Sequence, residues 1–288
     1  MNNKLRVIVI GATGMLGNAV LRVFKEDGNF NVIGTARSMH AARFLSEDVR
    51  RNLVVLDNIE DTDQLIELVG TFKPNVVINC VGIVKQLSAA GDPLKVLPIN
   101  AILPHRIARI CEVANARFVH VSTDCVFSGA KGMYSEMDFP DGRDLYGRSK
   151  LLGEVDYENA ITLRTSIIGH ELNSSHSLVD WFLSQDKAIK GYNQAIFSGL
   201  PTVEIGRIIV NLVLNQPTLR GVYHVSSAPI SKYDLLVLIA RIYKKNIDIL
   251  PSDDVVIDRS LDSSRFKAAT GFSAKPWDEL IRSMHEFG

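Results

Sequence analysis

Short apolar runs rich in valine and isoleucine alternate with longer amphipathic stretches through the first half of the chain. Such runs are typical of buried strands, whereas apolar positions spaced three and four apart favour helices. The strands predicted in this way are Leu5–Ile10, Asn31–Thr35, Leu53–Leu56, Val76–Cys80 and Phe118–Ser122. The helical pattern is clearest over Leu16–Phe24, Gln64–Val69 and Ile102–Val113, and Asp61 or Thr62 can cap the second of these.

This alternation predicts an α/β fold in which helices cover a parallel sheet. A helix that contains Tyr146 and a strand over Ile161–Ile167 extend the pattern. Beyond about residue 168 the spacing loosens into short elements, among them Gly199–Thr202 and Gly221–Ser227. We therefore expect a Rossmann-type doubly wound sheet over residues 1–168 and a smaller C-terminal lobe over residues 169–288 that closes over the strand ends.

Composition and charge narrow the class of protein. The chain has 288 residues, 46% of them apolar and 22% charged, which is the composition of a folded globular protein. Lys plus Arg and Asp plus Glu both number 32, so no overall field favours nucleic acid or an anionic membrane. No secretory signal pattern or membrane-length apolar stretch is present, so we expect a cytoplasmic protein. The three scattered cysteines form no CxxC pair, which argues against disulfides and a structural metal site.

A glycine-rich segment joins the first strand to the first helix. Strand Leu5–Ile10 runs directly into Gly11-Ala12-Thr13-Gly14-Met15-Leu16-Gly17. Glycines at such a junction allow a tight turn, a close approach of the backbone to a pyrophosphate, and close packing of helix on sheet. The spacing GxxGxxG is the form typical of short-chain dehydrogenases. The residues predicted to bind a dinucleotide here are Gly11, Thr13, Gly14, Met15, Leu16 and Gly17.

The second strand ends in Arg37 and Ser38, where NAD-binding proteins place an acidic residue for the adenosine ribose. A guanidinium can instead bind a 2′-phosphate through two hydrogen bonds, so the sequence favours NADPH, with NADH as the alternative. The third strand ends where the adenine would lie, and the fourth would pass beneath the middle of the cofactor. The residues predicted at these two strand ends are Asp57, Asn58, Cys80, Val81 and Gly82.

Tyr146 and Lys150 are four residues apart, which places them on one face of a helix. The pKa of a free phenol is near 10, and a nearby ammonium together with a nicotinamide cation would lower it toward neutrality. Tyr146 would then be a usable proton donor. Upstream, the fifth strand leads into Thr123, whose hydroxyl can bind the same substrate oxygen. These three side chains form the predicted catalytic group.

The motifs occur in the order and spacing of the extended short-chain dehydrogenases, and they resemble most closely the dTDP-4-dehydrorhamnose reductase family. The resemblance also rests on Ser122–Gly129, Tyr146–Glu154, Leu163–Ser166, Gly199–Thr202, Tyr223–Ser226 and Ser260–Asp262. It implies that residues 1–168 bind NADP and that residues 169–288 mainly bind substrate. In this family NADPH delivers a hydride to C4 of a nucleotide-linked 4-keto-6-deoxyhexose. The resemblance gives Tyr146 the role of acid, Thr123 that of the active-site hydroxyl, and Lys150 that of cofactor-ribose ligand.

Several further residues are expected on the substrate side of the site. The family usually has a tyrosine at the position of Cys125, and the segment Val81–Gln86 replaces the loop found there in the rhamnose enzymes. Lys85, in that segment, is read either as a contact to substrate or diphosphate or as a solvated loop lysine. The full set of substrate-binding candidates is Lys85, Asp124, Cys125, Val126, Arg164, His176, Pro201 and Thr202.

Two other functions stay open. The epimerase-reductases typified by GDP-fucose synthase use a Cys two residues beyond the catalytic hydroxyl and a downstream His, and Cys125 and His176 occupy comparable places. The chain also resembles the non-catalytic β subunit of methionine adenosyltransferase. A 4,6-dehydratase is disfavoured because Asp124 is followed by Cys125 and not by Glu. The sequence leaves the nucleotide, the sugar and the assembly open, with a homodimer as one form.

Overall fold

The computed structural model describes residues 4–85 and 88–288 of the chain. Seven strands form one parallel sheet, in the order β11-β6-β5-β4-β1-β2-β3. Their bounds are β1 Leu5–Ile10, β2 Phe30–Ala36, β3 Leu53–Val55, β4 Val76–Asn79, β5 Arg117–Thr123, β6 Ala160–Thr165 and β11 Gly221–His224. The order 3-2-1-4-5-6 that this contains is that of the doubly wound dinucleotide-binding fold, so the predicted fold class is confirmed.

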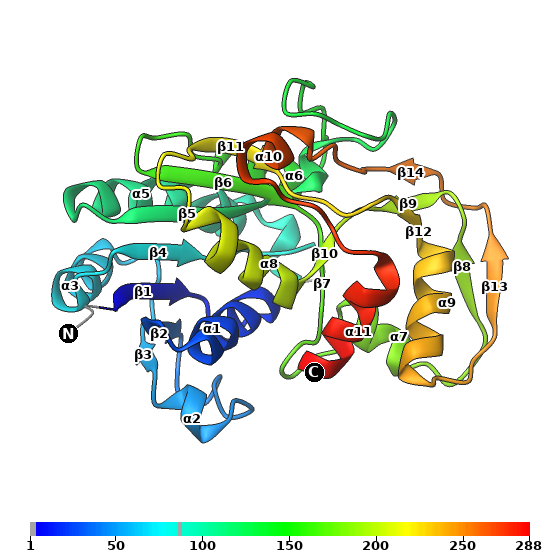
Figure 1. Ribbon diagram of the computed structural model, residues 1–288, viewed down its shortest axis with the longest axis horizontal. Coiled ribbons are helices and arrows are strands. Elements are labelled where there is room, and N and C mark those ends of the chain that lie inside the picture. Colours follow the sequence, from blue (N-terminus) through cyan, green and yellow to red (C-terminus); the bar gives the residue numbers. More distant parts are fainter. Residues whose placement is uncertain (1–3, 86–87) are drawn as a thin grey trace.

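Helices cover both faces of this sheet (Figure 1). Those before β6 are α1 Met15–Asp27, α2 Glu47–Arg50, α3 Thr62–Phe72, α4 Pro93–Leu97, α5 Leu103–Val113 and α6 Leu145–Leu152. One apolar core lies between the sheet, α1 and α8 (Thr202–Ile208), and a second lies between the sheet, α3 and α5. Asp61 caps α3 by accepting hydrogen bonds from Asp63 and Gln64 N–H, as its place before the apolar periodicity predicts.

The rest of the chain forms a smaller lobe beside the carboxyl ends of the strands (Figure 1). Its helices are α7 Leu178–Leu183, α9 Lys232–Tyr243 and α11 Trp277–Phe287, whereas α10 Ser264–Thr270 packs against β11 of the large sheet. Its short strands are β7 Ile167–Ile168, β8 Ile189–Tyr192, β9 Ala195–Phe197, β10 Leu200–Pro201, β12 Ile230–Ser231, β13 Ile249–Ser252 and β14 Ile257–Asp258. A third apolar core joins α7, α9 and α11.

The predicted boundary at residue 168 does not separate the sheet from this lobe. Strand β11 pairs with β6 in parallel and completes the large sheet, although its sequence lies far beyond the boundary. Helix α8 packs along α1, where Gly206 leaves room for Val23 and Val20. The expectation failed here because β11 and α8 are short, and their apolar side chains are recognisable as sheet-covering only once their partners are known. No helix among the described residues is long and apolar enough to cross a membrane.

The glycine turn generates a stability prediction. A Cβ on Gly17 would lie 2.1 Å from the carbonyl oxygen of Gly11, and this backbone atom cannot move without opening the turn. We expect Gly17→Ala to lower the free energy of unfolding by about 1–3 kcal/mol or more. Gly70→Ala, in α3, is the matched control: nothing lies within 4 Å of its added Cβ, and it should stabilise by about 0.5–1 kcal/mol. Urea denaturation of both variants measures this, and similar changes in the two would contradict the steric argument.

Candidate active site

The turn between β1 and α1 brings backbone donors to the carboxyl edge of the sheet. Gly11 has φ +86°, and its carbonyl accepts from Gly14 N–H at 3.0 Å. Thr35 anchors the turn from β2, because its hydroxyl oxygen accepts from Gly11 N–H at 3.1 Å and its carbonyl from Ala12 N–H at 2.9 Å. The first turn of α1 has neither an acidic side chain nor a side-chain cap. Its backbone N–H groups therefore suit an anion, as the glycine motif predicts.

The residues predicted to bind adenosine lie at the ends of β2 and β3. Arg37 and Ser38 are exposed, and the Ser38 hydroxyl oxygen accepts from Ala41 N–H at 3.2 Å, which closes a short turn. Asp57 is exposed at the rim of a pocket of about 610 Å³ between β3 and α3. Asn58 beside it uses its side-chain oxygen to accept from Glu60 N–H. The structure thus leaves the Arg37 guanidinium and the Asp57 carboxylate facing solvent near these strand ends.

Thr123, Tyr146 and Lys150 come together at the ends of β5 and α6. The Thr123 hydroxyl oxygen accepts from Cys125 N–H and donates to Asp124 Oδ1, both at 3.1 Å. Burial raises the pKa of Tyr146, and a hydrogen bond with the Thr123 side chain opposes this shift. Lys150 is 5% exposed, and burial lowers its pKa to about 8. Both shifts favour the uncharged forms of the two side chains.

The pKa of Tyr146 therefore moves opposite to the sequence expectation in the protein alone. That expectation relied on a Lys150 ammonium together with a nicotinamide cation, and burial lowers the pKa of this ammonium to about 8. Lys150 Nζ donates to the Val121 carbonyl at 2.8 Å and lies 3.3 Å from His120 Nε2. The structure confirms the shared placement that the four-residue spacing predicts, and it corrects the electrostatics.

Lys85 occupies a defined position at the mouth of this group. Its Nζ lies 2.6 Å from the carboxylate of Asp144, which caps α6 by accepting from Gly147 N–H at 2.7 Å. The ammonium also lies 5.6 Å from the centre of the Tyr146 ring. Lys85 is thus an exposed loop lysine that is held by Asp144, and its contact with substrate stays a prediction. Gln86, the last residue of the segment singled out in the sequence, lies outside the described residues.

Two predicted substrate-binding side chains are corrected by the structure. Arg164 is buried and makes a bidentate pair with Glu154, at 2.7 Å from Nε and 2.6 Å from Nη2, while its Nη1 lies 3.2 Å from His224 Nε2. Its guanidinium is thereby committed within the protein. Val126 is 1% exposed and packs in a small core with Phe127, so its side chain cannot reach a ligand. Each correction arises from burial that the local sequence does not reveal.

No hydrogen bond joins Cys125 and His176 among the described residues. Cys125 Sγ lies 3.8 Å from Arg259 Nη1, and burial raises the pKa of this thiol to about 11. His176 is exposed in the loop before α7, where its backbone N–H donates to Glu171. Asp124 and Cys125 stay half-buried beside Thr123.

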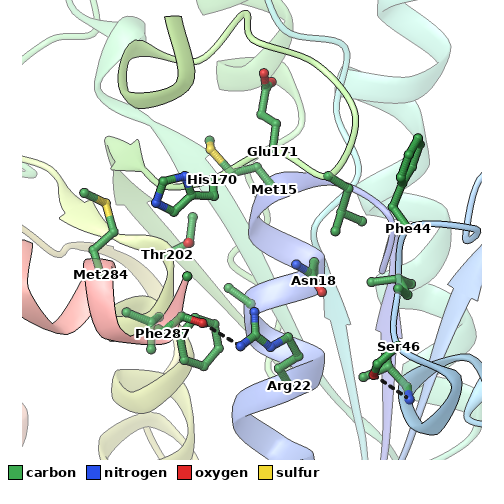
Figure 2. A pocket seen from close by; sticks show the side chains of 16 residues that line it. Met15, Asn18, Arg22, Phe44, Ser46, His170, Glu171, Thr202, Met284 and Phe287 are labelled. Carbon is green, nitrogen blue, oxygen red and sulfur yellow. Dashed lines mark hydrogen bonds between the residues drawn. The ribbon is translucent and has the colours of Figure 1, made fainter. Parts of the chain in front are cut away.

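Pro201 and Thr202 are buried where β10 meets α8. Thr202 lines a pocket of about 520 Å³ beside α1, shown in Figure 2, to which α1 contributes Asn18 and Arg22. Phe44 and Ser46 lie on one side of this pocket and Phe287 on the other. None of its lining residues is Thr123, Tyr146 or Lys150, so the structure places Thr202 in a separate pocket from the catalytic group.

Sequence reasoning missed three partners of the predicted residues. These are Asp144, which holds Lys85; Glu154, which holds Arg164; and His120, which faces Lys150. A signal for Asp144 was present, since Asp before a helical pattern is a common N-cap. The other two depend on contacts between distant segments and leave no local pattern.

Several curated proteins are similar to this chain in sequence. A protein of Haloferax volcanii named "Probable low-salt glycan biosynthesis reductase" is 34% identical over 165 residues, which span 56% of this chain and only 52% of that protein. The methionine adenosyltransferase 2 subunit beta of Danio rerio is 28% identical over 87% of this chain and 76% of its own. A dTDP-4-dehydrorhamnose reductase of Aggregatibacter actinomycetemcomitans is 23% identical over 98% of this chain and 99% of its own.

Solved structures share the whole fold. A hypothetical dTDP-4-dehydrorhamnose reductase from Sulfolobus tokodaii superposes with a TM-score of 0.77 at 26% identity, covering 95% of this chain and 98% of its own. The dTDP-4-dehydrorhamnose reductase of Bacillus anthracis, in complex with NADP, gives a TM-score of 0.80 at 22% identity, with 99% of both chains covered. The family model of the RmlD substrate binding domain matches residues 5–286. The chain therefore belongs to the RmlD substrate binding domain family, within the extended short-chain dehydrogenases.

Proposed function

We propose that this protein is an NADPH-dependent oxidoreductase that reduces the 4-keto group of a nucleotide-linked 4-keto-6-deoxyhexose, with NADH as a second cofactor. The observation that supports the proposal is that Thr123 ends β5, that α6 with Tyr146 and Lys150 packs against β5, and that the glycine turn follows the parallel strand β1 at the same edge of the sheet. Incubation with NADPH and a panel of dTDP-, UDP- and GDP-linked 4-keto-6-deoxy sugars tests it. Oxidation of NADPH with at least one of them is the expected result.

The glycine turn fits a dinucleotide. A Cβ on Gly11 would lie 2.7 Å from the Val81 side chain, so the turn and the end of β4 are already as close as backbone and side chain allow. With Gly14 exposed above this turn and α1 uncapped, backbone N–H groups of the turn would hold the pyrophosphate. The Arg37 guanidinium would bind the 2′-phosphate, and the Asp57 carboxylate would accept from the adenine amino group. Bound NADPH supplies the hydride for C4.

The chain's own side chains would handle the proton. Tyr146, whose buried phenol keeps its proton at neutral pH, would donate it to the oxygen that gains charge as the keto group is reduced. Thr123 would turn its hydroxyl hydrogen from Asp124 to that same oxygen. Lys150 would bind the ribose next to the reacting centre, and Lys85, at the mouth of the site, would attract the substrate diphosphate.

A second function is favoured by the likeness to the methionine adenosyltransferase 2 subunits, which extends over 87% of this chain for the Danio rerio protein. In that case the chain would be a regulatory subunit that binds the cofactor and has no catalytic activity. The sugar panel separates the two functions, because a subunit of this kind would bind NADPH and leave every keto sugar unreduced.

We predict that Arg37→Ala weakens NADPH by about 1.5–3 kcal/mol and changes NADH little, because only NADPH offers a phosphate for a charge-assisted hydrogen bond. Titration of both cofactors by calorimetry measures this. Arg43→Ala is the matched control, since the Arg43 guanidinium already bonds the His40 carbonyl and stacks on Phe44. Equal losses of NADPH and NADH affinity in Arg37→Ala would contradict the role.

We predict that Tyr146→Phe lowers kcat by at least about a hundredfold and leaves NADPH affinity unchanged, because it removes only the proton donor. Tyr157→Phe serves as the control, because the Tyr157 hydroxyl lies 2.8 Å from His105 Nδ1 and is not part of the catalytic group. This variant should retain the kcat of the unchanged protein. A near-normal kcat in Tyr146→Phe would show that another group gives the proton.

We predict no epimerase activity, because the buried Cys125 thiol has a pKa raised to about 11 and so stays neutral at physiological pH. In D2O without NADPH, NMR should show deuterium entering C3 and C5 of the keto sugar no faster than in an enzyme-free blank. Faster exchange that disappears in Cys125→Ser or His176→Ala would establish the bifunctional enzyme instead.

A further inference from the structure

A chain of buried polar groups runs beneath Lys150. It begins at Asn79, the last residue of β4, passes through His120 in β5 and ends at Lys150 on α6. Asn79 is 1%, His120 0% and Lys150 5% exposed. The Asn79 Nδ2 to His120 Nδ1 distance is 3.2 Å, and His120 Nε2 lies 3.3 Å from Lys150 Nζ. In an apolar interior each of these atoms needs a matching donor or acceptor.

The hydrogen-bond donors along this chain can be assigned one after another. Val81 N–H donates to Asn79 Oδ1 at 3.1 Å, which fixes the amide with its NH₂ group toward His120. That NH₂ group must donate, so His120 Nδ1 accepts. Burial holds the pKa of His120 well below its ordinary value, so the imidazole is neutral and carries a single proton. The proton therefore lies on Nε2, which faces Lys150.

This proton on His120 Nε2 bears on the protonation state of Lys150. An ammonium has three donors and no lone pair, so it would point an N–H at the N–H of His120. An amine accepts from His120 Nε2–H through its lone pair and still donates to the Val121 carbonyl at 2.8 Å. Reversing the Asn79 amide would relieve the ammonium, but it would set the NH₂ group against Val81 N–H.

We propose that His120 is a positioning residue: oriented by Asn79, it points its Nε2–H at Lys150 Nζ, holds this nitrogen in place, and makes the ammonium easier to deprotonate. The role in catalysis rests on the proposed reductase function, whereas the hydrogen bond itself does not. The lysine then gains or loses its proton near physiological pH, and His120 decides where that change falls.

Other groups lie near the buried row of Asn79, His120 and Lys150, but none of them removes the conflict between a Lys150 ammonium and the His120 Nε2–H. From the segment after α6, the Glu154 carboxylate raises the pKa of Lys150, but its oxygens already accept from Arg164 and Ser122. From the end of β4, Cys80 faces Lys150 as a neutral thiol, since burial raises its pKa to about 12. From α5, His105 disfavours a charged His120, and on α6 itself Tyr146 is a neutral phenol.

The test measures the protonation of Lys150 directly. In the full-length protein labelled with ¹³C-lysine, the Cε signal of Lys150 is identified by its absence in Lys150→Met and titrated with pH by NMR. His120→Gln replaces the Nε2–H donor with a carboxamide whose oxygen can accept from an ammonium. We expect the Lys150 midpoint to rise by about one pH unit in this variant. The alkaline limb of kcat, where the ammonium is lost, should rise with it.

His105→Gln is the matched control. His105 also joins two segments, bonding Tyr157 and the Leu152 carbonyl, but it does not touch Lys150. It should leave the Lys150 midpoint in place at a similar cost in stability. If His120→Gln does not fold, His120→Asn removes the same donor with a shorter side chain, and the midpoint should rise there too.

An unchanged or lowered midpoint in the folded His120 variant overturns the proposal, whatever the activity. A raised midpoint in a protein that reduces none of the keto sugars supports the hydrogen bond and refutes the reductase function. A raised midpoint together with a raised alkaline limb supports both. The NMR readout thus separates failure of this inference from failure of the proposed function.

Discussion

The parallel direction of all seven strands is the constraint on which the rest of the structure depends. Parallel strands have their carboxyl ends at the same edge of the sheet. The glycine turn after β1, the loop after β4 and Thr123 at the end of β5 therefore all lie at that edge. Between β1 and β4 the strand order reverses, which leaves a crevice at that edge. The turn at Gly11 packs so closely that a side chain at Gly11 or Gly17 would collide with neighbouring atoms.

Buried charge ties the second half of the chain to this edge. The Arg164 and Glu154 side chains are each 6% exposed, and such a pair is tolerated only when its hydrogen bonds are complete. Ser122 and His224 complete them, the first donating to Glu154 and the second accepting from Arg164. His224 belongs to β11, so the edge strand from the C-terminal half is joined to the residue that precedes Thr123. Arg164, which sequence reasoning assigned to substrate, instead links β6 to β11 through His224 and to Ser122 through Glu154.

What the sequence predicts well is what local spacing determines. Periodicity placed the first five strands and three of the helices to within a few residues, and the four-residue spacing placed Tyr146 and Lys150 on one face of α6. It failed where the outcome depends on contacts between distant segments. Strand β11 is recognisable only beside β6, the burial of Val126 only beside Phe127, and the pairing of Lys85 only once Asp144 has capped α6. The rise of the Tyr146 pKa in the protein without cofactor could not be read from the sequence for the same reason, since burial is a property of the assembled site.

Burial shifts the pKa values of Tyr146 and Lys150 in opposite directions, and in each case it disfavours the charged form of the side chain. It raises the pKa of the acid and lowers that of the base, so in the protein alone Tyr146 keeps its proton and Lys150 loses its proton at a lower pH than a free lysine does. For a reductase this state is useful, because the phenol has to hold its proton until negative charge appears on the substrate oxygen. A Tyr146 anion stabilised in advance by a permanent ammonium would suit the reverse reaction, in which the phenolate removes a proton from the alcohol. With its pKa lowered to about 8, Lys150 titrates closer to neutral pH than a free lysine does, and the negative charge of a phosphate-bearing cofactor would favour its ammonium form. The same burial that keeps Tyr146 protonated therefore keeps the charge of Lys150 adjustable, and His120 is the neighbour placed to adjust it.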